Sequence, residues 1–187
     1  NPLVAAAGTA AYGRELDDVM TLDALGGIVT KAVSLEPRSG APSPRVADFD
    51  GGMINAVGLA NPGADEVSRE HLPWLERHLQ VARVLVNVIG RVPEDFGEVV
   101  AALDASAGIS AYELNVSCPN TRAGGLEFGA DPVALATVVS RARAATKRPL
   151  FVTSSPTLTD VGENARRAGD AGADGITGRR TIPGLVL

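Results

Sequence analysis

The sequence predicts an α/β protein of the (β/α)8 TIM-barrel class, with about six βα units present in the chain. Short apolar or β-branched runs alternate with amphipathic stretches whose charged residues recur at helical spacing. No change of composition and no Ser-rich or Gly-rich linker divides the 187 residues. A complete barrel usually needs about 250 residues, so we expect residues 1–187 to form a single, incomplete barrel domain.

Six segments are predicted to be parallel strands. Each is a run of apolar residues, many of them β-branched, and most are separated by a helical stretch. That order favours parallel pairing, because parallel strands need a long crossover connection. The predicted strands comprise residues 3–7, 27–31, 84–89, 111–116, 150–153 and 175–177.

Five segments are predicted to be helices. Asp131 is expected to be an N-cap followed by Pro132 at the first helical position, and Thr159 and Asp160 can cap the next helix. Gly172 can adopt the left-handed conformation that ends a helix. The predicted helices comprise residues 14–24, 64–82, 93–104, 132–146 and 160–171.

Residues 35–61 are predicted to form a long loop. This stretch is rich in proline and glycine and has no helical periodicity. Loops of this length are usually functional or disordered. In a barrel this loop follows the second strand, on the face where active sites are built, so we expect a function for it.

Composition excludes several classes of protein. The net charge is −5 and the 17 Lys and Arg residues are scattered, which argues against binding to nucleic acid or to an anionic membrane. No apolar run reaches the roughly 18 residues needed to span a bilayer. The single Cys excludes an internal disulfide framework and favours the cytoplasm. We therefore expect a cytoplasmic protein that binds a small molecule or another protein.

Several polar residues are predicted to have no chemical role. His71 and His78 are two helical turns apart and are expected to lie on a solvated helix face. Glu113, Glu127 and Asp131 are too scattered to make a carboxylate pair. No spacing of Cys and His fits a metal site, so no metal is expected.

The stretch ELNVSCPN, residues 113–120, contains the only cysteine of the chain at the end of a predicted strand. A thiol has an ordinary pKa near 8.5 and can accept a proton from a carbon acid once its surroundings favour the thiolate. Asn115 and Asn120 can donate to and accept from a planar polar ligand. The alternative is that Cys118 is a small buried hydrophobic residue, which is the commoner role of a cysteine.

Five segments in register resemble the dihydroorotate dehydrogenases. They are NPLVAAAGTAAYG, GGIVTKAVSLEPRSGAPSPRVAD, GGMINAVGLANPG, ELNVSCPNTRAGGLEFG and the pair AGADGIT and TIPG, and together they span the chain. Cysteine in the fourth segment resembles class 1 of the family. The segment containing TKAVSLEPR is most similar to the NAD-linked subgroup that pairs with an iron-sulfur flavoprotein subunit.

The resemblance implies FMN-dependent oxidation of dihydroorotate to orotate in pyrimidine biosynthesis, with Cys118 as the proton-accepting base. It also implies a homodimer that can associate with the iron-sulfur flavoprotein subunit. Substrate contacts are then expected from Lys31, Asn55, Gly58, Leu59, Asn115, Asn120 and Thr181. FMN contacts are expected from Ala7, Gly8, Lys31, Ala32, Asn87, Asn115 and Thr153, with Thr9 beside Gly8.

Lys31 and Asn61 each have an ordinary structural alternative to ligand binding. Lys31 could be a surface lysine at a strand end, and Asn61, which closes the substrate loop, fits a turn residue equally well. Asn87 lies within an apolar strand, and its amide therefore needs a hydrogen-bond partner.

The chain departs from the family pattern on one side of the pocket. Thr153 in VTSSPT occupies the place of a lysine beside the flavin, and Arg180 replaces an asparagine, next to a second substitution at Arg179. A hydroxyl cannot replace an ammonium beside reduced flavin, and the glycine-rich loops for the FMN phosphate are absent from the sequence. The alternative function is therefore a non-redox pseudoenzyme or a binder of an anionic small molecule on the same scaffold.

Overall fold

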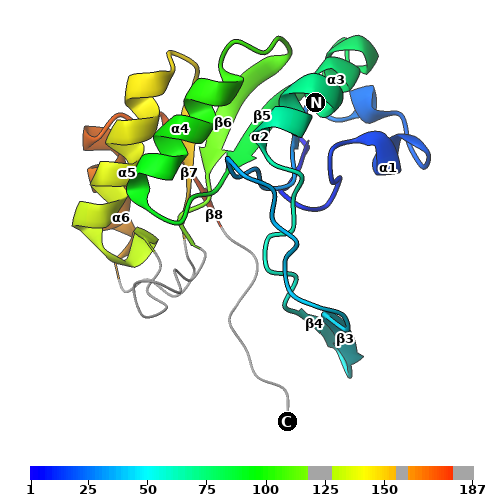
Figure 1. Cartoon of the computed structure of the whole chain (residues 1–187), viewed down its shortest axis with the longest axis horizontal. Helices are drawn as coiled ribbons and strands as arrows, with labels where there is room; N and C mark the ends of the chain where they lie inside the picture. Colours follow the sequence, from blue (N-terminus) through cyan, green and yellow to red (C-terminus); the bar gives the residue numbers. More distant parts are fainter. Residues whose placement is uncertain (118–127, 155–159, 179–187) are drawn as a thin grey trace.

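The computed structural model describes residues 1–117, 128–154 and 160–178. Within them, a sheet of parallel strands has the order β1-β2-β5-β6-β7-β8, so strands that follow one another in the chain are neighbours. This curled sheet with intervening helices is part of a (β/α)8 barrel, and the predicted fold class is confirmed (Figure 1). The strands are β1 (Val4–Ala5), β2 (Gly27–Val29), β5 (Arg83–Val88), β6 (Ile109–Leu114), β7 (Leu150–Ser154) and β8 (Gly175–Gly178).

The three longest helices, α4, α5 and α6, lie side by side against one face of the sheet (Figure 1). Two predicted caps are present: the Asp131 side chain accepts from the Val133 N–H, and that of Asp160 accepts from the Glu163 N–H. Thr159, the other predicted cap, lies outside the described residues. Gly172 ends α6 with a left-handed φ of 109°. The helices are α1 (Arg14–Asp17), η1 (Leu22–Ala24), α2 (Ala64–Glu66), the π-helix η2 (Val67–His71), α3 (Leu72–His78), α4 (Pro93–Leu103), η4 (Phe128–Ala130), α5 (Pro132–Ala145) and α6 (Val161–Asp170).

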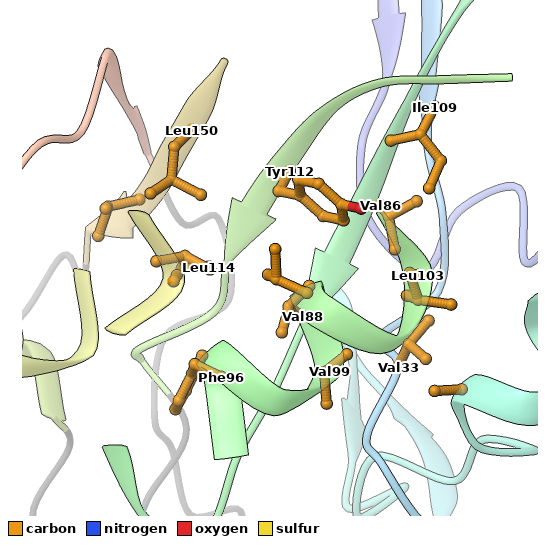
Figure 2. Packing of buried hydrophobic residues seen from close by; sticks show 14 of the residues in the cluster. Val33, Val86, Val88, Phe96, Val99, Leu103, Ile109, Tyr112, Leu114 and Leu150 are labelled. Carbon is orange, nitrogen blue, oxygen red and sulfur yellow. The ribbon is translucent and has the colours of Figure 1, made fainter. Parts of the chain in front are cut away.

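The hydrophobic core between these helices and the sheet determines which way each strand residue points. Val86 and Val88 of β5, with Tyr112 and Leu114 of β6, are buried against the helices, where Phe96 of α4 meets them (Figure 2). Successive side chains of a strand point to opposite faces. The residues between these four therefore point to the concave face of the sheet.

The predicted helix over residues 14–24 is wrong, because the segment forms one turn of α1 and the separate 3-10 turn η1. Leu22 is buried, but Val19 is 79% exposed and Met20 is 37% exposed. The segment thus lacks the continuous apolar stripe that holds a surface helix against a core. Strand β1 is also shorter than predicted, since the chain turns at Ala6, whose carbonyl accepts from the Thr9 N–H.

The helical region that starts at Ala64 ends at His78, four residues before the predicted end. The reason is Asp23, whose carboxylate accepts hydrogen bonds of 2.9–3.0 Å from the backbone N–H groups of residues 80–82. These N–H groups are therefore directed to a side chain rather than to helical carbonyls. Asp23 consequently ties the end of α3 to the start of β5.

The predicted loop over residues 35–61 contains an antiparallel hairpin that the sequence reading missed. Its strands are β3 (Val46–Phe49) and β4 (Gly52–Asn55), joined at Asp50 and Gly51. An Asp-Gly pair between two apolar runs is a strong hairpin signal, and Asp50 and Gly51 supply that signal here. The hairpin projects away from the sheet and its helices (Figure 1).

A polar cluster ties together the loops at the amino-terminal edge of the sheet. Asp104 follows α4, and its Oδ1 atom accepts from Thr146 Oγ1 at 2.6 Å and from Arg148 Nε at 3.3 Å. Arg148 also donates to the backbone carbonyls of Asp104 and Ser106. The cluster is structural, as is usual at this end of a barrel.

Among the described residues, no helix is long and apolar enough to cross a membrane.

We predict that Asp23 stabilises the fold in a pH-dependent way. The backbone hydrogen bonds from residues 80–82 hold the pKa of Asp23 below its usual range. A lowered folded pKa gives stability that is fully present above the ordinary aspartate pKa of roughly 3.9 and is lost as pH falls through the folded value. Asp23→Ala should therefore lower the melting temperature at pH 7.

The measurement is thermal unfolding by circular dichroism from pH 7 to pH 2 for the unmodified protein and for Asp23→Ala. The other carboxylates titrate in both proteins, so the difference between the two melting temperatures reports on Asp23. The difference in melting temperature between them should shrink at the acid end. A difference that stays constant over this range would contradict a charge-dependent role for Asp23.

Candidate active site

The concave face of the sheet carries two rows of side chains near the carboxyl ends of its strands. The strand register aligns Asn87, Glu113, Phe151 and Gly175 in the first row. In the second row Thr153 pairs with Thr177, and Asn115 lies directly after β6, two residues beyond Glu113. Residues two apart share a face of a strand, so both rows face the inside of the curled sheet. In barrels this end of the sheet carries the active site.

Asn87 and Glu113 form a buried pair in the first row. Asn87 is 1% exposed and Glu113 is 6% exposed, and Asn87 Nδ2 donates to Glu113 Oε1 at 2.6 Å. The expectation that Asn87 needs a partner is confirmed. Glu113, expected only to be too far from other acidic residues to form a carboxylate pair, is instead paired with an amide. A glutamate inside an apolar strand is itself a signal, because buried charges need partners.

The second row is attached to the first through the sheet. The Asn115 N–H donates to the Val88 carbonyl at 2.9 Å and so extends the β5–β6 ladder beyond Leu114. Ser117 is buried, and its Oγ atom donates to the Thr153 carbonyl at 3.0 Å. These contacts hold the chain to the sheet as far as Ser117, directly before Cys118.

Thr153 contributes a hydroxyl at the edge of this row. Its Oγ1 atom lies 3.4 Å from Thr177 Oγ1, within hydrogen-bond distance. Both side chains are half-buried. This part of the concave face is therefore polar but uncharged at Thr153.

Lys31 and Ala32 follow β2 at the same end of the sheet. The Lys31 N–H donates to the Ala11 carbonyl at 2.8 Å, and the Ala32 carbonyl accepts from the Tyr12 hydroxyl at 3.2 Å. Lys31 is half-buried and Ala32 is buried. The segment around Tyr12 therefore determines where the Lys31 backbone lies.

The predicted position of His71 on a solvated helix face is wrong. Its ring stacks on Tyr12 with centroids 4.3 Å apart, and its side chain is 19% exposed. Burial lowers the pKa of His71, with a contribution from Arg14, and burial raises that of Tyr12. His78, in contrast, is exposed and stacks on Trp74. Helical spacing alone could not separate the two histidines, because Tyr12 arrives from a distant part of the chain.

The predicted residues Ala7 and Gly8, with Thr9, form an exposed turn after β1. A Cβ atom added to Gly8 would meet no atom of the described residues within 4 Å. The backbone at Gly8 is thus open to a ligand on that side. Contact with FMN at these residues remains a prediction.

The predicted substrate loop lies on and beside the projecting hairpin. Asn55 ends β4 and is exposed. Gly58 has a left-handed φ of 72°, and a Cβ atom there would lie 2.7 Å from the Ala41 nitrogen. The close approach that Gly58 permits in this structure is therefore to the protein's own backbone. Leu59 also has a positive φ, of 57°.

Asn61 organises the base of this loop. It is 8% exposed, and its Oδ1 atom accepts from the Ser34 N–H at 3.2 Å and from the Gly63 N–H at 3.0 Å. Its Nδ2 atom donates to the Leu59 carbonyl and to Ser34 Oγ, each at 2.9 Å. Of the two expectations for Asn61, the structure thus shows the turn role.

Several predicted residues lie outside the described ranges. They are Cys118, Asn120 and Thr181, together with Arg179 and Arg180. Within the described ranges, no group of three His, Cys, Asp or Glu side chains is placed to hold a metal ion.

One buried acceptor on the concave face is left without a partner among the described residues. Asn87 Oδ1 is buried and has no hydrogen-bond partner among the described residues. A buried acceptor of this kind can be satisfied by an N–H group of a bound heterocycle. The hydroxyls of Thr153 and Thr177 and the open backbone at Gly8 add further polar groups and space. Asn87, Thr153, Gly8 and Lys31 are therefore the described residues that could hold the FMN ring.

The chain is similar in sequence to proteins of one known family. A family model described as dihydroorotate dehydrogenase matches residues 1–182. Similar curated proteins are named as catalytic subunits of dihydroorotate dehydrogenase B (NAD(+)), among them those of Pelobacter propionicus, Geobacter sp. and Cutibacterium acnes, at 42%, 41% and 42% identity. Each alignment covers all 187 residues of the chain and 61% of the relative. The chain thus spans about 61% of the length of these relatives.

We predict unequal stability effects for the two asparagines of the loop. Asn61→Ala should lower the free energy of unfolding by about 1–3 kcal/mol, because it leaves buried backbone groups without partners. Asn55→Ala is the matched control and should change it by less than about 0.5 kcal/mol, since Asn55 is exposed. Urea unfolding followed by the fluorescence of Trp74, the single tryptophan, measures both. Equal losses in the two variants would contradict the structural role of Asn61.

Proposed function

The chain belongs to the dihydroorotate dehydrogenase family, and from this premise we propose that it carries part of an FMN-dependent site that oxidises dihydroorotate to orotate in pyrimidine biosynthesis. The observation that carries the proposal is the row on the concave face that contains the buried pair Asn87 and Glu113, in which Asn87 Oδ1 has no partner among the described residues. Such a row at the carboxyl end of parallel strands is where barrel enzymes place their catalytic groups.

Cys118 is the proposed base. The oxidation removes a proton from a carbon beside a carbonyl and a hydride from the neighbouring carbon, and FMN, when bound, supplies the hydride acceptor. Cys118 takes the proton as its thiolate becomes a thiol. Support comes from Ser117, the preceding residue, which is buried and anchored on the Thr153 carbonyl directly beside the second row.

Amides and one ammonium group are proposed to orient the substrate. Asn115, together with Asn120 and Asn55, can match the imide and the carboxylate of a pyrimidine ring, because an amide both donates and accepts. Lys31 contributes a positive charge for the carboxylate or the flavin ring. Asn115 is the member of this set that the structure describes on the concave face, and it is half-buried there.

The proposed electron acceptor and partner follow from the relatives. The curated proteins are named catalytic subunits of an NAD(+)-linked dehydrogenase. We propose that this chain likewise acts as a catalytic subunit, as a homodimer, beside an iron-sulfur flavoprotein subunit that passes electrons to NAD.

A second candidate is a non-redox protein that binds an anionic small molecule on the same scaffold. It is favoured by Thr153, which presents a hydroxyl, paired with Thr177, where the family resemblance leads us to expect a lysine. The discriminating measurement is the visible absorption of the purified chain after incubation with FMN and removal of free flavin. A retained flavin spectrum supports the dehydrogenase, and a colourless protein supports the second candidate.

We predict that Cys118→Ala suppresses flavin reduction by dihydroorotate at neutral pH by about 100-fold or more, the usual effect of losing a general base. Orotate should still raise the melting temperature of the variant, because a ligand that binds only the native state stabilises it. Stopped-flow absorbance measures the first quantity and thermal unfolding with orotate the second. An unchanged reduction rate in Cys118→Ala would exclude this cysteine as the base.

A further inference from the structure

Glu113 is a buried carboxylate for which the proposed reaction has no use. It lies in β6, within a sheet whose strands on either side are β5 and β7, and it is 6% exposed. Its position in the strand register is directly opposite Asn87. The 2.6 Å contact between Asn87 Nδ2 and Glu113 Oε1 is short for a hydrogen bond from nitrogen to oxygen.

This contact determines which way the Asn87 amide is turned. A carboxylate oxygen only accepts hydrogen bonds, so the NH2 group of the amide must face Glu113. The carbonyl oxygen Oδ1 then faces away, where it is buried and has no donor among the described residues. A buried polar atom left without a partner costs free energy, so its orientation needs a cause and a purpose.

The backbone of Asn87 is held as well. Its N–H donates to Thr30 Oγ1 at 3.2 Å, and its carbonyl accepts from the Val33 N–H at 2.8 Å. Asn87 therefore cannot relieve the unpaired oxygen by moving its main chain. The remaining freedom is rotation of the amide, and Glu113 removes it.

We propose that Glu113 is a positioning residue, which turns Asn87 so that Oδ1 is available to an N–H donor of the flavin ring. The inference rests on the proposed function, since the flavin is the ligand that supplies this donor.

Glutamine at position 113 would fit the same space, but it could offer either an oxygen or an NH2 group to Asn87. The Asn87 amide could then turn over and present its own NH2 group to the flavin N–H, where two donors would meet.

The test compares Glu113→Gln with Glu98→Gln, a matched control on the exposed side of α4. Both substitutions remove one negative charge and keep the side-chain shape. We expect the FMN dissociation constant, measured by flavin fluorescence, to rise about tenfold in Glu113→Gln, which corresponds to one lost hydrogen bond. In Glu98→Gln it should not change. Equal FMN affinity in Glu113→Gln and the unmodified protein, at unchanged melting temperature, would overturn the proposal.

A rescue variant separates positioning from a merely structural contribution. In the double variant Asn87→Asp with Glu113→Gln, the glutamine NH2 group can donate to one aspartate oxygen, which leaves the other as an acceptor. FMN affinity should then recover to within about threefold of the unmodified protein, because the orientation of the acceptor is restored. Failure to recover affinity in a folded double variant would count against positioning.

The side-chain amide of Asn87 gives a readout that needs neither flavin nor activity. In the nitrogen-15 NMR spectrum of the flavin-free protein, one Asn87 Nδ2 proton should be shifted downfield and slow to exchange, and Glu113→Gln should remove this signature. Its absence from the unmodified protein would overturn the proposal even if Glu113→Gln does not fold. An unmodified protein that shows the signature but takes up no FMN would instead refute the proposed function and, with it, the flavin-directed role of the pair.

Discussion

The burial of alternate residues of β5 and β6 against the helices is the constraint on which the rest of the structure depends. Val86, Val88, Tyr112 and Leu114 fill the space beneath α4 and α5 (Figure 2). A slip of one residue in either strand would turn these apolar side chains to the opposite face, so the register is strongly specified. The same alternation places the intervening residues, Asn87 and Glu113 among them, on the concave face.

Polar side chains hold the connections at both ends of the sheet, and each does so by satisfying backbone groups. Asp23 accepts from three backbone N–H groups directly before β5. Asn61 accepts from the Gly63 N–H at the base of the hairpin loop, and Arg148 donates to the carbonyl of Ile109, the first residue of β6. Buried or half-buried backbone groups need such partners where the sheet ladder stops. Asn87 differs from these three residues, because its Oδ1 atom has no hydrogen-bond partner among the described residues.

Local patterns in the sequence predicted the elements whose signals are contained within a few residues. Asp131 and Asp160 cap their helices as expected, and the apolar runs of β5, β6 and β7 are strands. The hairpin also has a local signal, the Asp50-Gly51 pair, but this signal is a turn motif and does not show up as helical periodicity. The early end of α3 carried none, because Asp23, which causes it, lies more than fifty residues away in the chain.

The sequence by itself determined the fold class, the family, and the candidate residues at strand ends, since these depend on periodicity and on motifs that are contiguous in the chain. Only the tertiary structure decided how the candidates are used. It paired Asn87 with Glu113, stacked His71 on Tyr12, and assigned Asn61 to the turn rather than to the concave face. The pairs Asn87 with Glu113, Tyr12 with His71 and Ser34 with Asn61 join residues that lie 26 to 59 positions apart in sequence. Their geometry follows from strand register and packing across the sheet, which no local pattern encodes.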